Sequence, residues 1–124
     1  MNNNLNKLNY LHICENAFLS EGTRNLNIIG IFDTINTKGF PAAQPRFAVV
    51  ANITASNEDG HKTTLSIEKN GKKIVELNSN FKGKKQQLIQ NFLNFPFPEE
   101  GNYDVVIRLD EDLIGSTIII LKKI

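Results

Sequence analysis

Short runs of alternating apolar and polar residues, separated by turn-forming residues, extend along most of the chain. Side chains that alternate with a period of two lie on opposite faces of a strand, and β-branched and aromatic residues favour that conformation. No run shows a clear apolar stripe with the 3.6-residue period of a helix. The predicted strands cover residues 7–15, 26–32, 47–53, 63–68, 73–77, 103–109 and 116–121.

Turn signals between the runs predict how some strands connect. Asp59-Gly60 follows the third predicted strand, and Asn70-Gly71 follows the fourth. Such dipeptides favour the two-residue hairpin turn, because both central residues of that turn need positive φ. The sequence therefore predicts two antiparallel connections in a row, which together form a meander.

Residues 88–97 are the ambiguous segment. Part of it has the spacing of a helical stripe, but Ile89, Leu93 and Phe95 also share one face of a strand. Pro96 denies a helix its continuation, so we predict mainly strand. With this segment the chain has seven or eight strands spaced about ten residues apart, which predicts an all-β fold. We expect an antiparallel β-sandwich, immunoglobulin-like or C2-like, that forms one domain over residues 1–124, with residues 1–6 as a disordered polar head.

The segment before the strand at 103–109 adds to this prediction. Pro98, Gly101 and Tyr103 have the spacing of the corner found in many immunoglobulin-like sandwiches. In that corner a tyrosine hydroxyl bonds back to an upstream backbone carbonyl. We therefore assign Tyr103 a structural role.

Five motifs, taken in order, resemble a bacterial family of small single-domain proteins of unknown function. They span nearly the whole chain, and their order is more specific than any one of them. The resemblance implies a small β-sandwich and carries over no catalytic residue. The motifs are YLHICE at 10–15, IIGIFD at 28–33, FPA at 40–42, PRF at 45–47 and FPEEGNY at 97–103.

Composition narrows the expected partners and location. The 124 residues are 40% hydrophobic and carry a net charge of +1, which gives no long-range field to attract a polyanion or a membrane. Cys14 is the only cysteine, so an internal disulfide is excluded. The asparagine-rich beginning of the sequence lacks the apolar core of a secretory signal. We expect a cytoplasmic protein that needs no cofactor and binds no membrane.

Several residues have the types used in catalysis or metal binding, but their spacing is poor for either. His12 and Cys14 share one face of a predicted strand, whereas Glu15 points to the other. A structural zinc site needs four ligands, and a nucleophilic cysteine needs a histidine oriented by an acid. We expect no metal site, no catalytic residue and no enzymatic activity, with Cys14 buried. Gly30 predicts a bulge or a close approach of a neighbouring strand, because no helix follows it to cradle a phosphate.

The loop at 34–45 is the most plausible binding site on the expected sandwich. Asp33 and Arg46 flank it, and they either contact a ligand or pair with each other at its base. We favour the pair, at a point where the chain passes from one sheet to the other.

Lys82, Lys84 and Lys85 belong to a lysine-rich stretch that predicts a basic edge. Such an edge can bind an anion, but nucleic acid is disfavoured because Phe81 is the only aromatic residue among these lysines. Lysines also protect an exposed sheet edge against pairing, which is the explanation we favour.

The last predicted strand carries large aliphatic side chains on both faces. A sandwich buries one face of each strand, so we expect the other face to contact a loop, a second copy or a protein partner. The residues are Ile118, Ile119, Ile120 and Leu121. The sequence thus predicts a non-enzymatic binding or protein-interaction module. The alternative is a small-molecule or anion-binding domain that uses Arg46 and the lysine edge, and the third interpretation is a hydrolase that uses Cys14.

Overall fold

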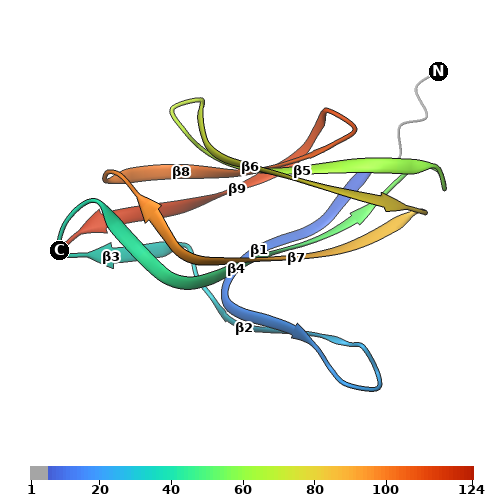
Figure 1. Cartoon of the computed structure of the whole chain (residues 1–124), viewed down its shortest axis with the longest axis horizontal. Helices are drawn as coiled ribbons and strands as arrows, with labels where there is room; N and C mark the ends of the chain where they lie inside the picture. Colours follow the sequence, from blue (N-terminus) through green and yellow to red (C-terminus); the bar gives the residue numbers. More distant parts are fainter. Residues whose placement is uncertain (1–5) are drawn as a thin grey trace.

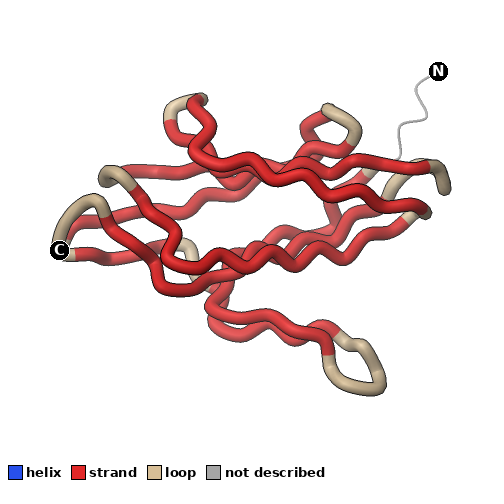
Figure 2. The backbone as a smooth tube through the Cα atoms, in the orientation of Figure 1, coloured by secondary structure: helices blue, strands red, loops and turns tan. Residues whose placement is uncertain are grey.

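Within residues 6–124, which the computed structural model describes, nine strands form two sheets that stack face to face (Figure 1). Short loops join the strands, and no helix occurs in that range (Figure 2). The strands are β1 (Lys7–Leu19), β2 (Leu26–Ile31), β3 (Thr34–Thr37), β4 (Ala42–Thr54), β5 (Gly60–Lys69), β6 (Lys72–Lys82), β7 (Lys85–Phe97), β8 (Gly101–Leu109) and β9 (Asp112–Lys123).

The predicted β-sandwich is confirmed. The four-stranded sheet has the order β2-β1-β4-β7, and the five-stranded sheet has the order β3-β9-β8-β5-β6. Neighbouring strands are antiparallel except for β3 and β9, which are parallel. The strand that the prediction of seven or eight omitted is β3, which lies in the expected loop at 34–45. Its sequence Thr-Ile-Asn-Thr has little apolar content, and it becomes a strand by pairing with the end of β9.

The two predicted hairpin turns have different outcomes. Asn70 and Gly71 connect β5 to β6 with φ of 53° and 78°, which confirms the predicted two-residue turn. Asp59-Gly60 does not form a hairpin, because β4 and β5 belong to different sheets and the chain crosses between them. The predicted meander is therefore wrong at its first connection.

Residues 88–97 are strand, as predicted, and form most of β7. This strand pairs with β4 over its whole length, from Ala42 opposite Phe97 to Thr54 opposite Lys85. Of the expected disordered head at 1–6, residues 1–5 lie outside the described residues. Asn6 is described, and its Oδ1 accepts a hydrogen bond of 2.8 Å from the backbone N–H of Ser56.

The core lies between the two sheets and is rich in aromatic rings. Phe47 of β4 is fully buried and stacks on Phe92 of β7, with 4.9 Å between the ring centroids. Phe95 meets the same ring edge-on at 6.0 Å, and Phe97 lies 6.1 Å from it. Burying a side chain of this size contributes about 1.5–3 kcal/mol, so this cluster stabilises the contact between the sheets.

Tyr103 forms the predicted corner at the end of the sandwich. Its side chain is fully buried, and its hydroxyl donates to the backbone oxygen of Glu99 at 2.6 Å. The same hydroxyl accepts a hydrogen bond of 3.0 Å from the backbone N–H of Glu99. These two bonds hold the β7–β8 loop against the core.

Candidate functional site

The β1–β2 hairpin is the part of the fold that leaves the sandwich. β1 pairs with β4 from Lys7 to Cys14, and beyond Cys14 it pairs only with β2 within the described residues. Figure 1 shows the resulting hairpin bending away below the sheet that contains β4 and β7. Gly30 lies in β2 with φ of 69° and with the Glu15 side chain directly over it, which confirms the predicted close approach. A left-handed conformation favours glycine, so Gly30 permits the bend.

One side of this hairpin packs against the outer face of the four-stranded sheet. The contacts form a second apolar cluster, separate from the core between the sheets. Its fully buried members are Cys14, Ala48 and Val50, and Ala17 is 7% exposed. Leu26 and Ile28 of β2 pack against them. The hairpin is therefore fixed to the sheet and presents its other side outwards.

The outward side of the hairpin is apolar and exposed. Ile29 and Ile31, two residues apart in β2, are 50% and 60% exposed, and Phe18 of β1 is 44% exposed. Phe18 lies diagonally across from Ile29, because Asn16 is the residue opposite Ile29. Aromatic side chains reach such diagonal neighbours.

A fourth exposed apolar side chain lies on β7, at the other edge of the same sheet. Leu93 of β7 is 72% exposed and lies opposite Arg46 of β4. The Arg46 guanidinium donates a hydrogen bond of 3.0 Å to Oδ1 of Asn16, which connects the residue opposite Leu93 to the hairpin. We call Phe18, Ile29, Ile31 and Leu93 the hairpin surface. A group of exposed apolar side chains in one region of a fold is typical of interaction sites.

The hairpin surface also borders a free sheet edge. β2 is the outermost strand of the four-stranded sheet, so its second edge has no neighbouring strand among the described residues. Unpaired backbone N–H and C=O groups on such an edge can accept a strand from another chain. This part of the molecule therefore combines apolar side chains with backbone hydrogen-bonding capacity.

The predicted pair of Asp33 and Arg46 does not form within the described residues. Asp33 follows β2 at the crossing between the sheets, and its carboxylate accepts a hydrogen bond of 2.8 Å from the Thr34 hydroxyl. Arg46 remains on the outer face of the four-stranded sheet and bonds to Asn16. The crossing itself is confirmed, since β2 and β3 belong to different sheets.

The predicted lysine edge does not meet Arg46 either. Lys82 ends β6, Lys84 lies in the loop and Lys85 begins β7, and all three are exposed. Lys85 lies opposite Thr54 in the β4–β7 ladder, whereas Arg46 lies opposite Leu93. At about 3.3 Å per residue these positions are roughly 26 Å apart along the strands. One ligand of ordinary size cannot contact both.

The last strand is only partly available to a partner. Ile119 and Leu121 are fully buried in the core, which corrects the prediction that all four aliphatic residues form an interface. Ile118 and Ile120 lie on the outer face, where Ile118 is 42% exposed. Strand alternation explains the division, and β3 covers one edge of β9.

Cys14 lies in the apolar cluster under the hairpin and is fully buried, as predicted. Its thiol contacts the Ala48 carbonyl oxygen at 3.7 Å, and desolvation raises its pKa. His12 stacks on Tyr10 with 5.6 Å between the ring centroids. Among residues 6–124, no group of three or more His, Cys, Asp or Glu side chains is arranged to hold a metal ion.

His61 makes a charged contact that the sequence does not predict. Its Nδ1 lies 2.6 Å from the Asp110 carboxylate, and its Nε2 lies 3.1 Å from the carbonyl oxygen of Asn57. Both partners accept hydrogen bonds, so the doubly protonated ring satisfies both. The hydrogen bond to Asp110 is the main cause that raises the pKa of His61. This contact connects the beginning of β5 to the β8–β9 turn.

The fold and the hairpin surface together define a β-sandwich domain with a projecting apolar hairpin. Residues 9–122 match the model of a family described as of unknown function (DUF6941), and the chain belongs to that family. This match confirms the predicted resemblance to a family of unknown function. The search of curated proteins finds no match.

The chain resembles two solved structures. One is Pseudomonas fluorescens alkylpurine DNA glycosylase AlkC bound to DNA containing an abasic site analogue, with a TM-score of 0.52 and 12% identity. The match covers 94% of this chain and 30% of the glycosylase, so the chain spans less than a third of that protein. The other is an immunoglobulin-like protein from Pseudomonas aeruginosa, with a TM-score of 0.48, 9% identity, and coverage of 94% of this chain and 96% of that one.

None of the described residues forms a helix long and apolar enough to cross a membrane.

Proposed function

We propose that this domain is a non-enzymatic protein-interaction module that contacts its partner through the hairpin surface. The observation that carries the proposal is the exposure of Ile29 and Ile31 on one side of a strand whose outer edge has no neighbouring strand within residues 6–124. A partner strand that pairs with β2 gains backbone hydrogen bonds, while its side chains cover the two isoleucines.

The environment of Cys14 supports a non-enzymatic role. A cysteine nucleophile reacts as the thiolate, which needs access to the substrate and a lowered pKa. Cys14 is fully buried, and burial raises its pKa. The same proposal places the domain in a bacterial cytoplasm, which fits a single unpaired thiol. Cell fractionation of its source tests the location.

The test compares Ile29→Asp with Leu113→Asp. Leu113 is 64% exposed and belongs to β9, so it provides a matched control for an exposed apolar side chain outside the hairpin surface. Because neither side chain is in the core, we expect both variants to fold. Circular dichroism and thermal unfolding verify this before binding is measured.

Sedimentation velocity over a wide micromolar range first determines whether the partner is a second copy. A dimer that Ile29→Asp dissociates and Leu113→Asp retains identifies the homodimer predicted from the sequence. If the wild-type protein is a monomer, capture from lysate of its source follows with all three proteins. A partner retained by the wild type and Leu113→Asp but lost by Ile29→Asp supports the proposal. Equal retention by all three refutes it.

A further inference from the structure

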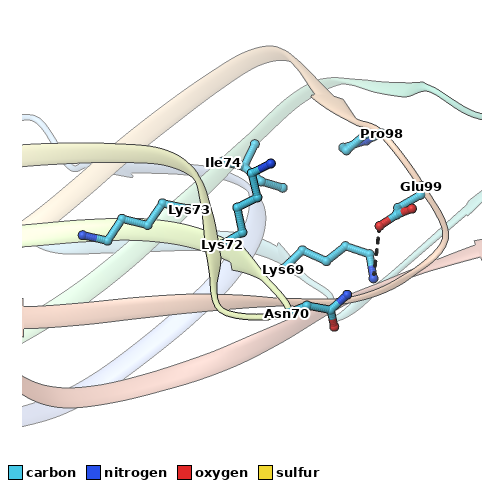
Figure 3. Close-up of a pocket in the computed structure, with 7 residues that line it drawn as sticks. All are labelled: Lys69, Asn70, Lys72, Lys73, Ile74, Pro98 and Glu99. Carbon is cyan, nitrogen blue, oxygen red and sulfur yellow. Dashed lines mark ion pairs between the residues drawn. The ribbon is translucent and has the colours of Figure 1, made fainter.

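A basic cleft lies at the end of the sandwich formed by the β5–β6 turn and the β7–β8 loop (Figure 3). Its volume is about 540 Å³, which is within the range of small-molecule sites. Lys69, Lys72, Ile74, Pro98 and Glu99 line it. The cleft belongs to the five-stranded sheet, whereas the hairpin surface belongs to the opposite sheet (Figure 1).

Lys69 is held in place before any ligand arrives. Its side chain is only 14% exposed, and its ammonium lies 5.4 Å from the centroid of the Tyr103 ring. Gly101 allows this position, because a Cβ atom there would lie 2.7 Å from the Lys69 Nζ. A lysine fixed in this way loses less side-chain freedom when it binds an anion.

The Lys69 ammonium has donors to spare. The nearest carboxylate oxygen, on Glu99, is 3.8 Å away, which is too far for a hydrogen bond. The Lys69 Nζ donates no hydrogen bond within residues 6–124. Every fully buried side-chain N or O atom in that range has a hydrogen-bond partner, so the Lys69 Nζ is not fully buried. The Lys69 Nζ therefore remains accessible to an incoming acceptor. Figure 3 shows it directed towards Glu99 across the cleft.

The charges in the cleft favour a monoanion. Lys72 has no ion-pair partner among the described residues, whereas Lys73 pairs with Glu76 at 2.5 Å and points away from Lys69 (Figure 3). Lys69 and Lys72 supply two positive charges, and Glu99 supplies one negative charge. The remaining charge of +1 matches one carboxylate, and Ile74 and Pro98 provide apolar contacts for the rest of the ligand.

We propose that this cleft binds a small organic carboxylate. Its anionic group binds the Lys69 ammonium, the exposed Lys72 side chain turns towards it from its place beside Ile74, and its apolar part lies against Ile74 and Pro98 (Figure 3). The proposal does not depend on the hairpin surface. The Ile29→Asp variant, which is expected to lose partner binding, is expected to bind the carboxylate with the same affinity as the wild type.

Phenylacetate is the probe, followed by amide chemical shifts of the ¹⁵N-labelled protein. We expect saturable shifts at Asn70, Gly71 and Glu99. Lys72 is exposed, so we expect Lys72→Gln to fold normally. This variant is expected to weaken binding roughly tenfold, because one charge-assisted hydrogen bond is lost. Lys69→Gln is expected to weaken it at least as much. Lys82→Gln, at the other end of β6, is the matched control and is expected to bind as the wild type does.

Two further ligands make the test specific. 2-Phenylethanol has the ring without the charge, and inorganic phosphate has charge without the ring, so both are expected to bind much more weakly than phenylacetate. Comparable affinity for 2-phenylethanol would overturn the role of the lysines. Comparable affinity for phosphate would overturn the assignment to an organic carboxylate. Unchanged phenylacetate affinity in Lys72→Gln would overturn the site itself.

Discussion

The Tyr103 hydroxyl offers the sharpest test of what fixes the β7–β8 loop. Tyr103→Phe removes one oxygen and keeps the fully buried ring, so the core packing against Phe97 is retained. The change deletes the bond to the Glu99 carbonyl and the bond from the Glu99 N–H. No other atom of the core needs to move.

The expected cost follows from these two hydrogen bonds. Each net hydrogen bond contributes about 1 kcal/mol, and water can reach part of the exposed loop after the change, so we expect a loss of about 1–2 kcal/mol in the free energy of unfolding. For a domain of this size that corresponds to a decrease of roughly 4–8 °C in Tm. The substitution retains the aromatic ring beneath Lys69, so we expect the Lys69 ammonium to keep its position in the basic cleft.

Urea unfolding, with the m-value compared between variants, measures this loss. Tyr10→Phe is the matched control, because Tyr10 is the only other tyrosine and its hydroxyl donates to the exposed Gln87 side chain at 2.6 Å. We expect that control to differ from the wild type by less than about 0.5 kcal/mol. If Tyr103→Phe is equally neutral, the corner does not stabilise the fold and the reasoning is refuted. Faster hydrogen exchange at the Glu99 amide is a second expected result.

Three other predictions concern the remaining polar and strained sites. Gly30→Ala places a Cβ on a residue with φ of 69°, and we expect a loss of about 1–2 kcal/mol by urea unfolding; an unchanged midpoint would show that the hairpin can relax. The pKa of His61 is raised in the folded protein, so its ion pair with Asp110 contributes fully to the free energy of unfolding below the unfolded pKa of about 6.5. That contribution is lost as the pH rises through the folded pKa. In His61→Ala we expect the free energy of unfolding, measured against pH, to lack this decrease. Cys14 should react with a thiol reagent only upon unfolding, and rapid labelling of the native protein would contradict its burial.

The predictable parts of the fold are those with strong local signals. Asn70-Gly71 specifies its own turn, and the spacing from Pro98 to Tyr103 specifies the corner. The strand at 88–97 is locally ambiguous, and Pro96 and Pro98, together with the strands predicted on either side, decide it. In these cases the conformation follows from residues close together in the chain.

The parts that could not be predicted depend on contacts between distant segments. β3 is a strand only because the end of β9 lies beside it. Arg46 meets Asn16 and not Asp33, because the β1–β2 hairpin bends over the sheet. Gly30 permits that bend, but the local sequence does not specify its direction. The sequence does contain one signal for the hairpin surface. The segment Ile28-Ile29-Gly30-Ile31 has apolar side chains on both faces of its strand, which is the feature that indicated an interface on the last strand. Lys69 ends β5 and Glu99 lies in the β7–β8 loop, so only the folded chain brings them together at the cleft.

The parallel pairing of β3 with β9 has a consequence for protein synthesis. Thr34 pairs opposite Ile120, so the ribosome must make nearly all of the domain before the partner of β3 exists. Contacts between segments so distant in sequence form slowly, because the intervening chain must close as a loop. Until β9 emerges, β8 lacks its neighbour on one edge and the core lacks Ile119 and Leu121. Chaperones that bind unfolded apolar segments are expected to recognise the nascent chain during this interval.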